Sequence, residues 1–353
     1  MAYTISAAQL KEFCAAACRA FGYSEDAASI TAEVLVETDM MGVYSHGTKN
    51  LLGYMHKTEA GGIHKDANIQ VLREGPAWAV MDADAAIGMV ASYEAMNKAI
   101  EKAAACGIAM VNIRNSTHFG AAGYYASMAA KRGMIGIAIS NTDPNMTVPG
   151  GKGREIGNSP VSIAVPQKSG EPLFLDIALS AVAALKIEQA KADGKAIPDT
   201  WAVDENGYPT TNPADYMNGG SAQPMAAHKG YGLSMMAEIL TGVLTGGAYL
   251  HQITSWGWDL PTTNKVSHCF LAIDISQFME PGQFADRLQD YTDKIHNSPK
   301  RDDTAALYVP GELDNARYAR AVANGITLPD DVAGNLLKLS ELSGIAIAME
   351  RSN

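Results

Sequence analysis

The spacing of apolar residues changes twice along the chain. Over residues 1–73 apolar positions recur every three or four residues, which is typical of helices. Over 74–182 and 226–299, apolar runs typical of strands alternate with helical stretches, and helical spacing returns over 300–353. We therefore predict one helical domain made of 1–73 with 300–353. An α/β domain made of 74–182 with 226–299 is inserted into it, and 183–225 forms a small helical or loop segment.

Capping signals predict where the first helices begin. Ser6 and Gln9 have the spacing of a capping box ahead of "LKEFCAAACRAFG". Ser24, followed by two acidic residues, predicts a second helix that runs to about Asp39. A third helix is predicted from near Ser45 to the glycine pair at 61–62.

The middle of the chain is predicted to alternate between strands and helices. The predicted strands are "NIQVLREG", "AWAVMDAD", "IAMVNIRNS", "MIGIAISN", "SPVSIAVP", "PLFLDIAL" and "HCFLAIDIS". The predicted helices are "GMVASYEAMNKAIEKAAACG", "GAAGYYASMAAKRG", "AVAALKIEQAKADG", "YGLSMMAEILTGVLTGG" and "PGQFADRLQDYTDKIHN", with two more around "ARYARAVANG" and "PDDVAGNLLKLSEL". Residues 195–224 are predicted to be a connection rich in glycine and proline.

Composition and charge narrow the choice of partners. Hydrophobic residues make up 47% of the 353 positions and charged residues 18%, which suits a compact folded protein. The formal net charge is −11 and no dense lysine or arginine patch occurs, so we expect neither nucleic acid nor a membrane as partner. The first residues lack the basic start and apolar core of a secretory leader, and we expect a cytoplasmic protein.

Cysteine and histidine spacing gives no support to a metal centre or a disulfide framework. The four cysteines are unevenly spaced, and we interpret Cys14 and Cys18 as buried small apolar residues. The eight histidines include no H-E-x-x-H motif, and His46 with His56 lacks a carboxylate at ligand spacing. We expect no metal. The chain also lacks G-x-G-x-x-G at a strand-to-helix junction and lacks a P-loop, which disfavours a Rossmann or P-loop nucleotide site.

Three segments concentrate reactive side chains. Ser45 and His46 are either a helix cap beside a surface histidine or part of an active site. They do not form a hydrolase-like pair, because neighbouring side chains diverge. His118 follows a strand and precedes a glycine-containing helix start, a position where α/β proteins bind anions, although it could equally cap that helix. Lys229 lies at the start of a long helix and could meet a phosphate, or lie on a solvated face.

Taken together, these segments resemble the type 2 malate/L-lactate dehydrogenase family, which also includes sulfolactate and ureidoglycolate dehydrogenases. The matching stretches are "GVYSHGTKNLLGY", "NSTHFGAAGYYASMAAKRGMIGIAISNT", "VPGGKGREIGNSPVSIAVP", "LDIALSAVAALKI", "GYPTTNPAD", "HKGYGLSMMAEILTGVLTG" and "VPGEL", in the family's order over nearly the whole chain. Several long motifs in one order are far more specific than any one of them.

The resemblance implies a fold and a reaction. It implies an α/β protein of the α+β type whose NAD(P)-binding sheet is largely antiparallel and not a Rossmann fold. The helical domain from both chain ends would supply substrate and dimer contacts, and the protein would be a homodimer. The implied reaction is hydride transfer between a nicotinamide and C2 of a small 2-oxo or 2-hydroxy acid, or of the related imine, with histidine handling the proton.

Site residues are implied one by one. His46 matches the family's Ser-His-Gly histidine and is expected to donate the proton, with Ser45 orienting it; His118 is expected to line the pocket, although some relatives give it the acid/base role. Tyr54 is expected to contact the substrate. The implied cofactor-binding residues are His118, Phe119, Gly120, Ala121, Ala122, Ser140, Asp176, Ile177, Ala178, Lys229, Gly230, Pro310, Gly311 and Glu312.

Two positions depart from the family pattern. Many relatives carry an arginine that clamps the substrate carboxylate where this chain has Asn50, with Lys49 beside it. Their Gly-Thr-Asn-Pro segment reads Gly-Asn-Ser-Pro here, which places Asn158 on the substrate side. These changes put simple malate or lactate in doubt. They allow a larger or less anionic substrate, or a carboxylate held by Lys49.

The sequence leaves alternatives open for both the cofactor and the function. Ala184 and Leu185 stand where relatives often have a basic residue, so we expect NAD, with NADP still open. The alternatives to a 2-hydroxy acid dehydrogenase are a ketimine (cyclic imino acid) reductase or a ureidoglycolate-type dehydrogenase on the same scaffold. A non-catalytic binding protein is disfavoured by the joint presence of His46, His118 and Lys229.

Overall fold

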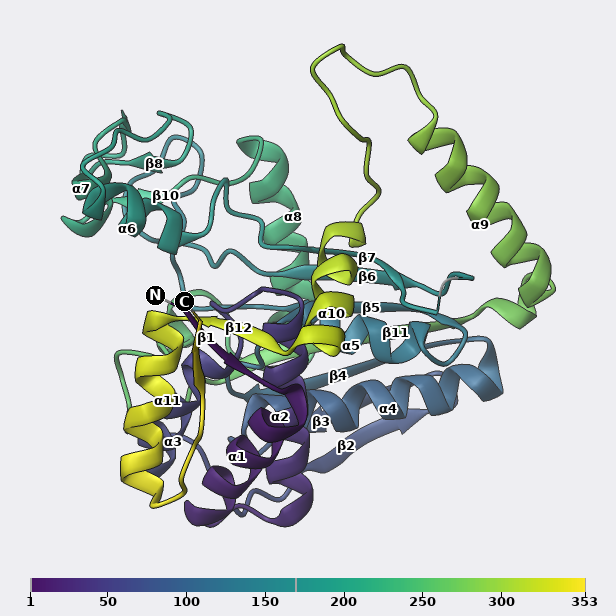
Figure 1. Cartoon of the computed structure of the whole chain (residues 1–353), viewed down its shortest axis with the longest axis horizontal. Helices are drawn as coiled ribbons and strands as arrows, with labels where there is room; N and C mark the ends of the chain where they lie inside the picture. The colour runs from purple at the N-terminus through teal and green to yellow at the C-terminus, as the bar shows by residue number, and fades with distance from the viewer. Residues whose placement is uncertain (1, 169, 353) are drawn as a thin grey trace.

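A seven-stranded mixed sheet forms the centre of the computed structural model, which describes residues 2–168 and 170–352 (Figure 1). Its neighbouring strands are antiparallel except β3 and β4, which are parallel. In spatial order the strands are β2 (Gln70–Gly75), β3 (Trp78–Asp82), β4 (Ile108–Ser116), β11 (Val266–Asp274), β5 (Met134–Ser140), β6 (Val161–Val165) and β7 (Leu173–Ile177). The expected α+β fold with a largely antiparallel, non-Rossmann sheet is confirmed, since a Rossmann sheet is mostly parallel.

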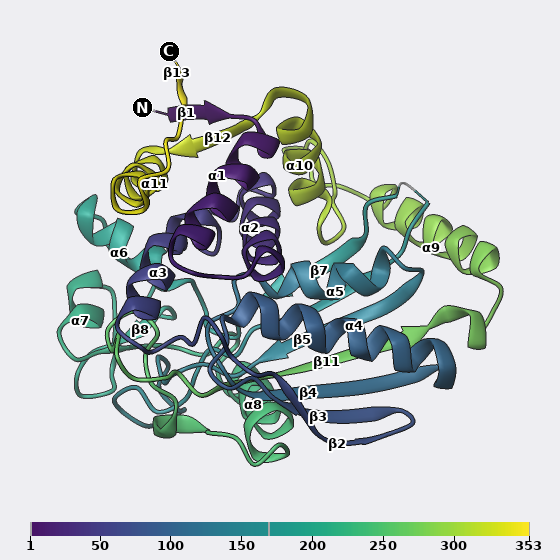
Figure 2. The ribbon, with the colours of Figure 1, turned by 90° about the horizontal axis from the view of Figure 1, so that it is seen from below.

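Strand alternation gives this sheet two differently covered faces. Ala109, Val111 and Ile113 of β4 point to one face and join the main core, which helices α4 (Gly88–Cys106) and α5 (Ala122–Ala130) cover. Met110 points to the other face and packs in a small cluster with Ala237 of α8 (His228–Glu238). Figure 2 shows α4 and α5 on one side of the sheet and α8 on the other. A π-helical turn, η2 (Ile239–Val243), continues α8.

The N-terminal helices begin largely where their capping signals place them. The Ser6 hydroxyl accepts from the Gln9 backbone N–H at 3.2 Å and caps α1 (Ala7–Ala20), and Ser24 caps α2 (Glu25–Met40). The predicted start of the third helix near Ser45 is wrong. A 3-10 turn, η1 (Thr48–Asn50), comes first, and α3 (Leu51–Glu59) follows it. Thr48 donates two hydrogen bonds to Asp39, which hold it in this turn, so the α-helix begins only at Leu51.

The two ends of the chain pair with each other. Strand β1 (Ala2–Ile5) lies between β12 (Ile326–Pro329) and β13 (Glu350–Ser352) and is antiparallel to both. Helices α10 (Glu312–Asn324) and α11 (Asp330–Ser343) flank β12 in the chain, and Figure 1 places both termini side by side. The helical pattern of these end segments did not predict the three short strands.

A small unit lies beside the central sheet (Figure 1). The connection predicted at 195–224 contains a three-stranded sheet of its own, ordered β10-β8-β9. A separate core cluster, with Met146, Ile187 and Tyr216 among its members, holds this unit together. Its elements are α6 (Ala184–Ala192), β8 (Ala202–Val203), β9 (Pro209–Thr210), α7 (Pro213–Met217) and β10 (Ser221–Ala222).

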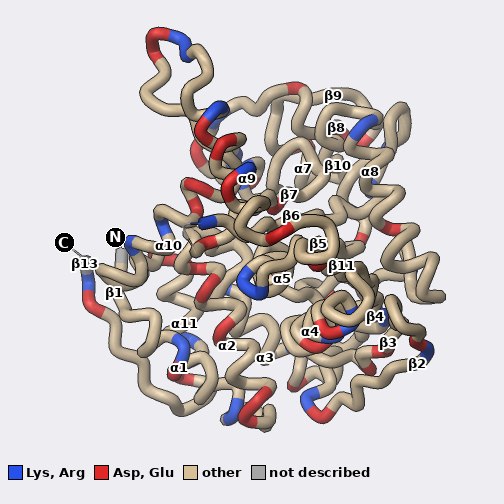
Figure 3. Tube along the Cα trace, turned by 90° about the vertical axis from the view of Figure 1, so that its right-hand side faces the viewer, with Lys and Arg blue, Asp and Glu red and all other residues tan. Residues whose placement is uncertain are grey.

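The remaining elements lie between α8 and α10. They are η3 (Leu250–Gln252), η4 (Ile275–Gln277) and α9 (Pro281–His296), and α9 projects from the body with a long loop behind it (Figure 1). Figure 3 shows acidic and basic residues interspersed along the trace in that view. Within the described residues, none of the helices combines the length and the apolar character needed to span a bilayer.

Candidate active site

A cavity of about 750 Å³ opens between the loop after α2, the β4–α5 turn and the start of α6. It gathers most of the residues expected to form the site. Those that line it are Ser45, His46, Lys49, Asn50, His118, Phe119, Gly120, Ala121, Ala122, Ser140, Asn158, Asp176, Ala178, Pro310 and Gly311. Segments far apart in the sequence therefore meet around one space.

Two histidines and two larger aromatic rings form one stacked group at this cavity. The His46 and His118 ring centroids are 5.6 Å apart, and Trp256 stacks on His118 at 4.9 Å. Tyr54 lies behind them, with its hydroxyl 2.6 Å from His118 Nδ1. Ser45 Oγ lies 2.9 Å from His46 Nδ1, so both imidazoles have a hydroxyl partner that fixes the ring orientation.

Burial keeps this group uncharged. Burial, followed by the nearby rings of His46 and His268, lowers the pKa of His118 to about 3. Burial also lowers the pKa of His46 below its ordinary value of 6.5 and raises the pKa of Tyr54. Tyr54 therefore stays protonated and donates to His118 Nδ1, which leaves the His118 proton on Nε2.

The loop that carries His46 rests on a buried carboxyl group. Asp39 is 1% exposed, and one of its oxygens accepts from the Thr48 hydroxyl at 2.5 Å and from the Thr48 N–H at 3.2 Å. Its other oxygen has no hydrogen-bond partner among the described residues and lies where a Cβ at Gly47 would be. Burial raises the pKa of Asp39 to about 7. Only glycine fits at position 47, which fixes how the chain passes from His46 to Thr48.

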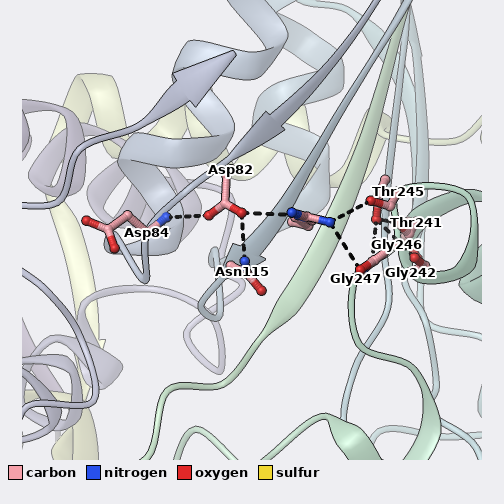
Figure 4. Close-up of polar contacts among 9 residues, drawn as sticks. Asp82, Asp84, Asn115, Thr241, Gly242, Thr245, Gly246 and Gly247 are labelled. Atoms are coloured by element: carbon pink, nitrogen blue, oxygen red, sulfur yellow. Dashed lines mark hydrogen bonds and ion pairs between the residues drawn. The ribbon is translucent and has the colours of Figure 1, made fainter. Parts of the chain in front are cut away.

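A second polar network anchors the strand that leads to His118. The Arg114 guanidinium donates to Asp82 at 3.1 Å and to the carbonyls of Thr245 and Gly246 at 3.1 and 3.2 Å. Asn115 donates to the same Asp82 oxygen at 2.7 Å. Figure 4 shows the labelled Asp82 and Asn115 on one side of this network and the labelled Thr245, Gly246 and Gly247 of the turn after η2 on the other. The network joins the ends of β3 and β4 to that turn.

A third histidine is buried beneath the β4–α5 turn. His268 is fully buried and stacks on Phe119 at 4.4 Å between ring centroids. Its Nδ1 lies 2.9 Å from Ser140 Oγ and its Nε2 lies 3.0 Å from Ser116 Oγ. Burial lowers the pKa of His268 to about 3, so it acts as a neutral link that holds β4, β5 and Phe119 in register.

Two helix N-termini made of small residues reach the cavity. The first residues of α5 and α6 line it, and neither N-cap residue, Ala121 or Ala183, has a side chain that can cap its helix. Uncapped N–H groups at a helix start favour an anion. Beside α5, Asp176 accepts from the Gly123 N–H at 2.7 Å. Loss of solvation inside the cavity raises the pKa of this carboxyl to about 6, against the lowering effect of the Gly123 N–H.

The side chains that depart from the family pattern already have partners. Asn50 Nδ2 donates to the Ser45 carbonyl at 2.8 Å, and Lys49 Nζ forms an ion pair with Asp331 at 2.6 Å. Asn158 Oδ1 accepts from Asn145 at 3.0 Å and from Thr142 at 3.2 Å. Each of the three still lines the cavity.

Five of the expected residues do not line the cavity. Tyr54 contacts the cavity only indirectly, through its hydrogen bond to His118. Ile177 is the last residue of β7 and pairs with Val161. Lys229 is exposed at the start of α8, and the Gly230 N–H donates to Met225 at 2.9 Å. Glu312 pairs with His296 at 2.8 Å. A cofactor role for Ile177, Lys229, Gly230 and Glu312 remains a prediction.

Three residues at the site were missed from the sequence. Asp39 and His268 look like ordinary members of a helix and a strand, and Trp256 lies in an irregular loop. The spacing "TDMMGVYSHG", with an acid shortly before the Ser-His-Gly segment, was the one signal available for Asp39. The described residues contain no cluster of three or more His, Cys, Asp or Glu side chains placed to share a metal ion.

Comparison with known proteins identifies the family of the chain. The sequence model of the family described as malate/L-lactate dehydrogenase matches residues 5–337. The chain is 37% identical to a malate dehydrogenase of Pyrococcus abyssi over 92% of this chain and 90% of that protein. It is 34% identical to an NAD(+)-dependent ureidoglycolate dehydrogenase of Escherichia coli K12, over 88% of each.

A solved structure extends the likeness to the whole fold. The delta1-piperideine-2-carboxylate reductase from Pseudomonas syringae superposes with a TM-score of 0.85 at 27% identity, covering 95% of this chain and 99% of that one. Fold and sequence thus agree, and the chain belongs to the malate/L-lactate dehydrogenase family of oxidoreductases.

Proposed function

We propose that this chain transfers a hydride between NAD and C2 of a small 2-oxo or 2-hydroxy carboxylic acid, with His46 carrying the proton. The observation that carries the proposal is the shared cavity. It holds the paired histidines, the two helix N-termini and Asp176 within about 750 Å³, which is enough for a dinucleotide and a small acid.

The cavity fits a nicotinamide dinucleotide on two counts. The start of α6, which has no side-chain cap, offers backbone N–H groups to a diphosphate, and small residues at 121–123 and 183–184 let it approach the backbone. Asp176 offers a carboxylate oxygen to ribose hydroxyl groups. A bound nicotinamide supplies or accepts the hydride. The protein residues orient the substrate and move the proton.

His46 is better suited to the proton step than His118. The pKa of His118 lies near 3, and its Nδ1 is occupied by the Tyr54 hydroxyl. The pKa of His46 is lowered by burial alone, and Ser45 holds its Nδ1, which leaves Nε2 to face the substrate oxygen. Neutral His46 accepts the hydroxyl proton in the oxidative direction, and protonated His46 returns it in the reductive direction.

Charge in the cavity favours NAD over NADP. A 2′-phosphate would need a cationic partner, and Lys49 is the only lysine or arginine among the described residues that line the cavity. It lies three residues after His46, whereas Asp176 and Asp314 line the cavity close enough to each other to interact electrostatically. Two carboxylates near a 2′-phosphate would repel it.

The proposal predicts that NADH binds at least about tenfold more tightly than NADPH, a difference that one unfavourable charge contact can supply. Equilibrium titration of nicotinamide fluorescence measures both affinities. Oxidation of each cofactor is then followed by absorbance with a panel of 2-oxo acids, cyclic imines and, in reverse, ureidoglycolate. If the protein bound neither cofactor and oxidised neither with any panel member, the proposed function would be wrong.

A cyclic imine reductase is the second candidate. The observation in its favour is the structural likeness to the piperideine-carboxylate reductase. The same cavity and the same proton donor serve both reactions, because an imine and a ketone each gain a hydride at C2 and a proton on the neighbouring heteroatom. Faster turnover of cyclic imines than of 2-oxo acids in the panel would favour this candidate.

We further propose that two copies pair through the outer face of α8, in the α/β domain, rather than through the helical domain that the family resemblance implies. Leu233, Met236, Leu240, Val243 and Leu244 form one stripe along this helix and are between 37% and 59% exposed. Ile163 and Leu175 extend the apolar surface onto the sheet. An apolar stripe of this length is typical of an interface, and a twofold axis would let it cover itself.

If this interface forms, the wild-type protein should sediment as a dimer in a sedimentation-velocity experiment. Val243→Asp places a charge in the centre of the stripe and is expected to give a monomer at micromolar concentration. Leu342→Asp, at an exposed apolar residue of α11 away from the stripe, is the matched control and should stay dimeric. A monomeric wild-type protein would contradict the proposal.

A further inference from the structure

We infer that Lys57 is a positioning residue of the proposed reaction. Its buried ammonium group binds the loop of residues 254–264 and so holds Trp256 against His118. The inference rests on the proposed function, because His118 and Trp256 both line the cavity in which the hydride would be transferred. Three observations carry it: the partners of Lys57, the closure of the loop at its base and the packing of the Trp256 ring.

Lys57 lies on α3 and is fully buried, which is rare for a lysine. Its Nζ donates to the carbonyl oxygens of Asp259 at 2.5 Å, Thr262 at 2.6 Å and Leu260 at 3.4 Å. An ammonium group has three N–H donors, so the loop supplies one acceptor for each of them. Burial lowers the pKa of Lys57, and the nearby Asp259 carboxylate acts against this effect. Lys57 therefore has no donor left for a substrate, and its charge acts on the loop.

The 254–264 loop is closed at its base by hydrogen bonds between its two ends. The Thr254 N–H donates to the Asn264 carbonyl at 3.1 Å, and the Asn264 side-chain amide donates to the Thr254 carbonyl at 2.9 Å. The Thr254 hydroxyl adds a bond of 2.8 Å to the Thr263 carbonyl. Between its ends the loop contains neither helix nor strand. The three bonds from Lys57 fix the opposite side of this loop to α3.

The Trp256 ring connects the loop to the histidines. Tyr54 and Lys57 are three residues apart on α3 and therefore lie on the same face of the helix. The Tyr54 ring centroid is 5.3 Å from that of Trp256, which in turn stacks on His118 at 4.9 Å. Trp256 and the carbonyl groups bound by Lys57 belong to one closed loop. Movement of those carbonyl groups away from α3 would therefore carry Trp256 away from His118.

Glycine at position 62 lets the loop come this close to α3. A Cβ at Gly62 would lie 2.1 Å from the Leu260 carbonyl oxygen and 2.9 Å from Lys57 Nζ. A larger residue at position 62 would push the loop away without removing the ammonium group. Substitutions at Lys57 and at Gly62 thus disturb the same contact by different means, one by loss of charge and one by size.

The contact matters for the reaction because of what Trp256 covers. Its stacked ring excludes water from one face of the His118 imidazole and keeps that imidazole where Tyr54 donates to it. When the loop is open before the substrate binds, part of the binding free energy is used to close it. Loss of the Lys57 bonds should therefore raise KM more than it lowers kcat.

Lys57→Met keeps the length of the side chain and removes all three donors. Each hydrogen bond to a charged group contributes a factor of about ten or more, so the loop should be mostly open without them. We expect kcat/KM for the best substrate of the panel to fall about tenfold, mainly through KM. The affinity for NADH should change less than about twofold, because the start of α6 lies outside this contact.

Lys102→Met is the matched control. It removes another lysine bond to a backbone carbonyl, that of Gly75 at 2.9 Å, in the hairpin of β2 and β3 outside the cavity. Its kcat/KM should stay at the wild-type value. An equal loss in Lys102→Met and Lys57→Met would mean that the effect is one of general stability, and the inference would be wrong.

Two further measurements separate positioning from a general loss of structure. Trp258 is 92% exposed in the same loop, so chymotrypsin cleavage after it reports on loop opening and should be at least about tenfold faster in Lys57→Met. If Lys57 acts through Trp256, the double variant Lys57→Met/Trp256→Ala should lose no more kcat/KM than Trp256→Ala alone. Losses that multiply in the double variant would contradict the inference.

Gly62→Ala tests the same contact if Lys57→Met does not fold. It should raise KM and speed cleavage after Trp258, as Lys57→Met does. Gly257→Ala, at a loop glycine whose added Cβ meets no atom within 4 Å, should leave both unchanged. If the wild type reduces panel members and both Lys57→Met and Gly62→Ala keep its kcat/KM, the inference is wrong while the proposed function stands. If the wild type reduces none of them, the proposed function is wrong and the inference falls with it.

Discussion

His46→Gln is expected to lose hydride transfer by about a thousandfold in kcat, because a positioned acid/base side chain contributes between a hundred and ten thousandfold. Glutamine keeps the size and polarity of the side chain but cannot release or accept a proton. The affinity for NADH should stay close to that of the wild type, since the groups proposed to hold the dinucleotide lie on α5, α6 and β7. Steady-state kinetics and fluorescence titration measure the two effects.

The pH profile distinguishes a proton donor from a structural residue. Since burial lowers the pKa of His46 below 6.5, reductive kcat/KM in the wild type should fall as pH rises, starting below pH 6.5. The oxidative direction should reach its plateau at neutral pH. His46→Gln should flatten both profiles, and His64→Gln, at a half-exposed histidine outside the cavity, is the matched control. If the pH profile were flat in His118→Gln and normal in His46→Gln, His118 rather than His46 would be the proton donor.

Asp39→Asn is expected to make the protein more stable above pH 7. The folded-state pKa of Asp39 is about 7 against an ordinary value of 3.8, so the folded protein holds this proton more tightly than the unfolded chain does. Between these two values the unfolded chain releases the proton first, and the wild type loses stability as pH rises. The total loss is on the order of 4 kcal/mol.

Asparagine removes this loss because it stays neutral and its oxygen can still accept from Thr48. Thermal unfolding at pH 5 and pH 8 should therefore show a small difference between variant and wild type at pH 5 and a clear gain for the variant at pH 8. Asp26→Asn, at an exposed acid on the first turn of the same helix, serves as the control. Equal destabilisation of Asp39→Asn at both pH values would mean that Asp39 is ionised in the folded protein.

Local patterns predicted the elements that local forces define. The capping box of Ser6 and Gln9, the cap at Ser24 and the glycine that ends α4 at Gly107 act within a few residues of sequence. The strands of the central sheet were also predictable, because buried strands need apolar runs of recognisable length. The segments that line the cavity were found because each carries its own motif.

Features that depend on distant partners were not predictable. Strand β1 has its partners at residues 326–352, and nothing in its four residues indicates a sheet. The predicted helix start near Ser45 is wrong because the Thr48 hydroxyl donates a hydrogen bond to Asp39 and so holds this loop. No local sequence pattern indicates that bond. His268 and Trp256 take their meaning from rings that approach them across the fold. The exposed position of Lys229 likewise depends on how α8 packs.

The pairing of β1 with β12 and β13 also sets the order in which the chain can be completed during synthesis. Strand β1 leaves the ribosome before the two strands that flank it, which emerge only after residues 326–352 have been made. Until then β1 has two unpaired edges, and the apolar faces of α1 and α2 lack their packing against α10 and α11. The nascent protein therefore depends on residues 326–352 to complete the sheet around β1, and the interval before they are made is when it is most exposed to aggregation.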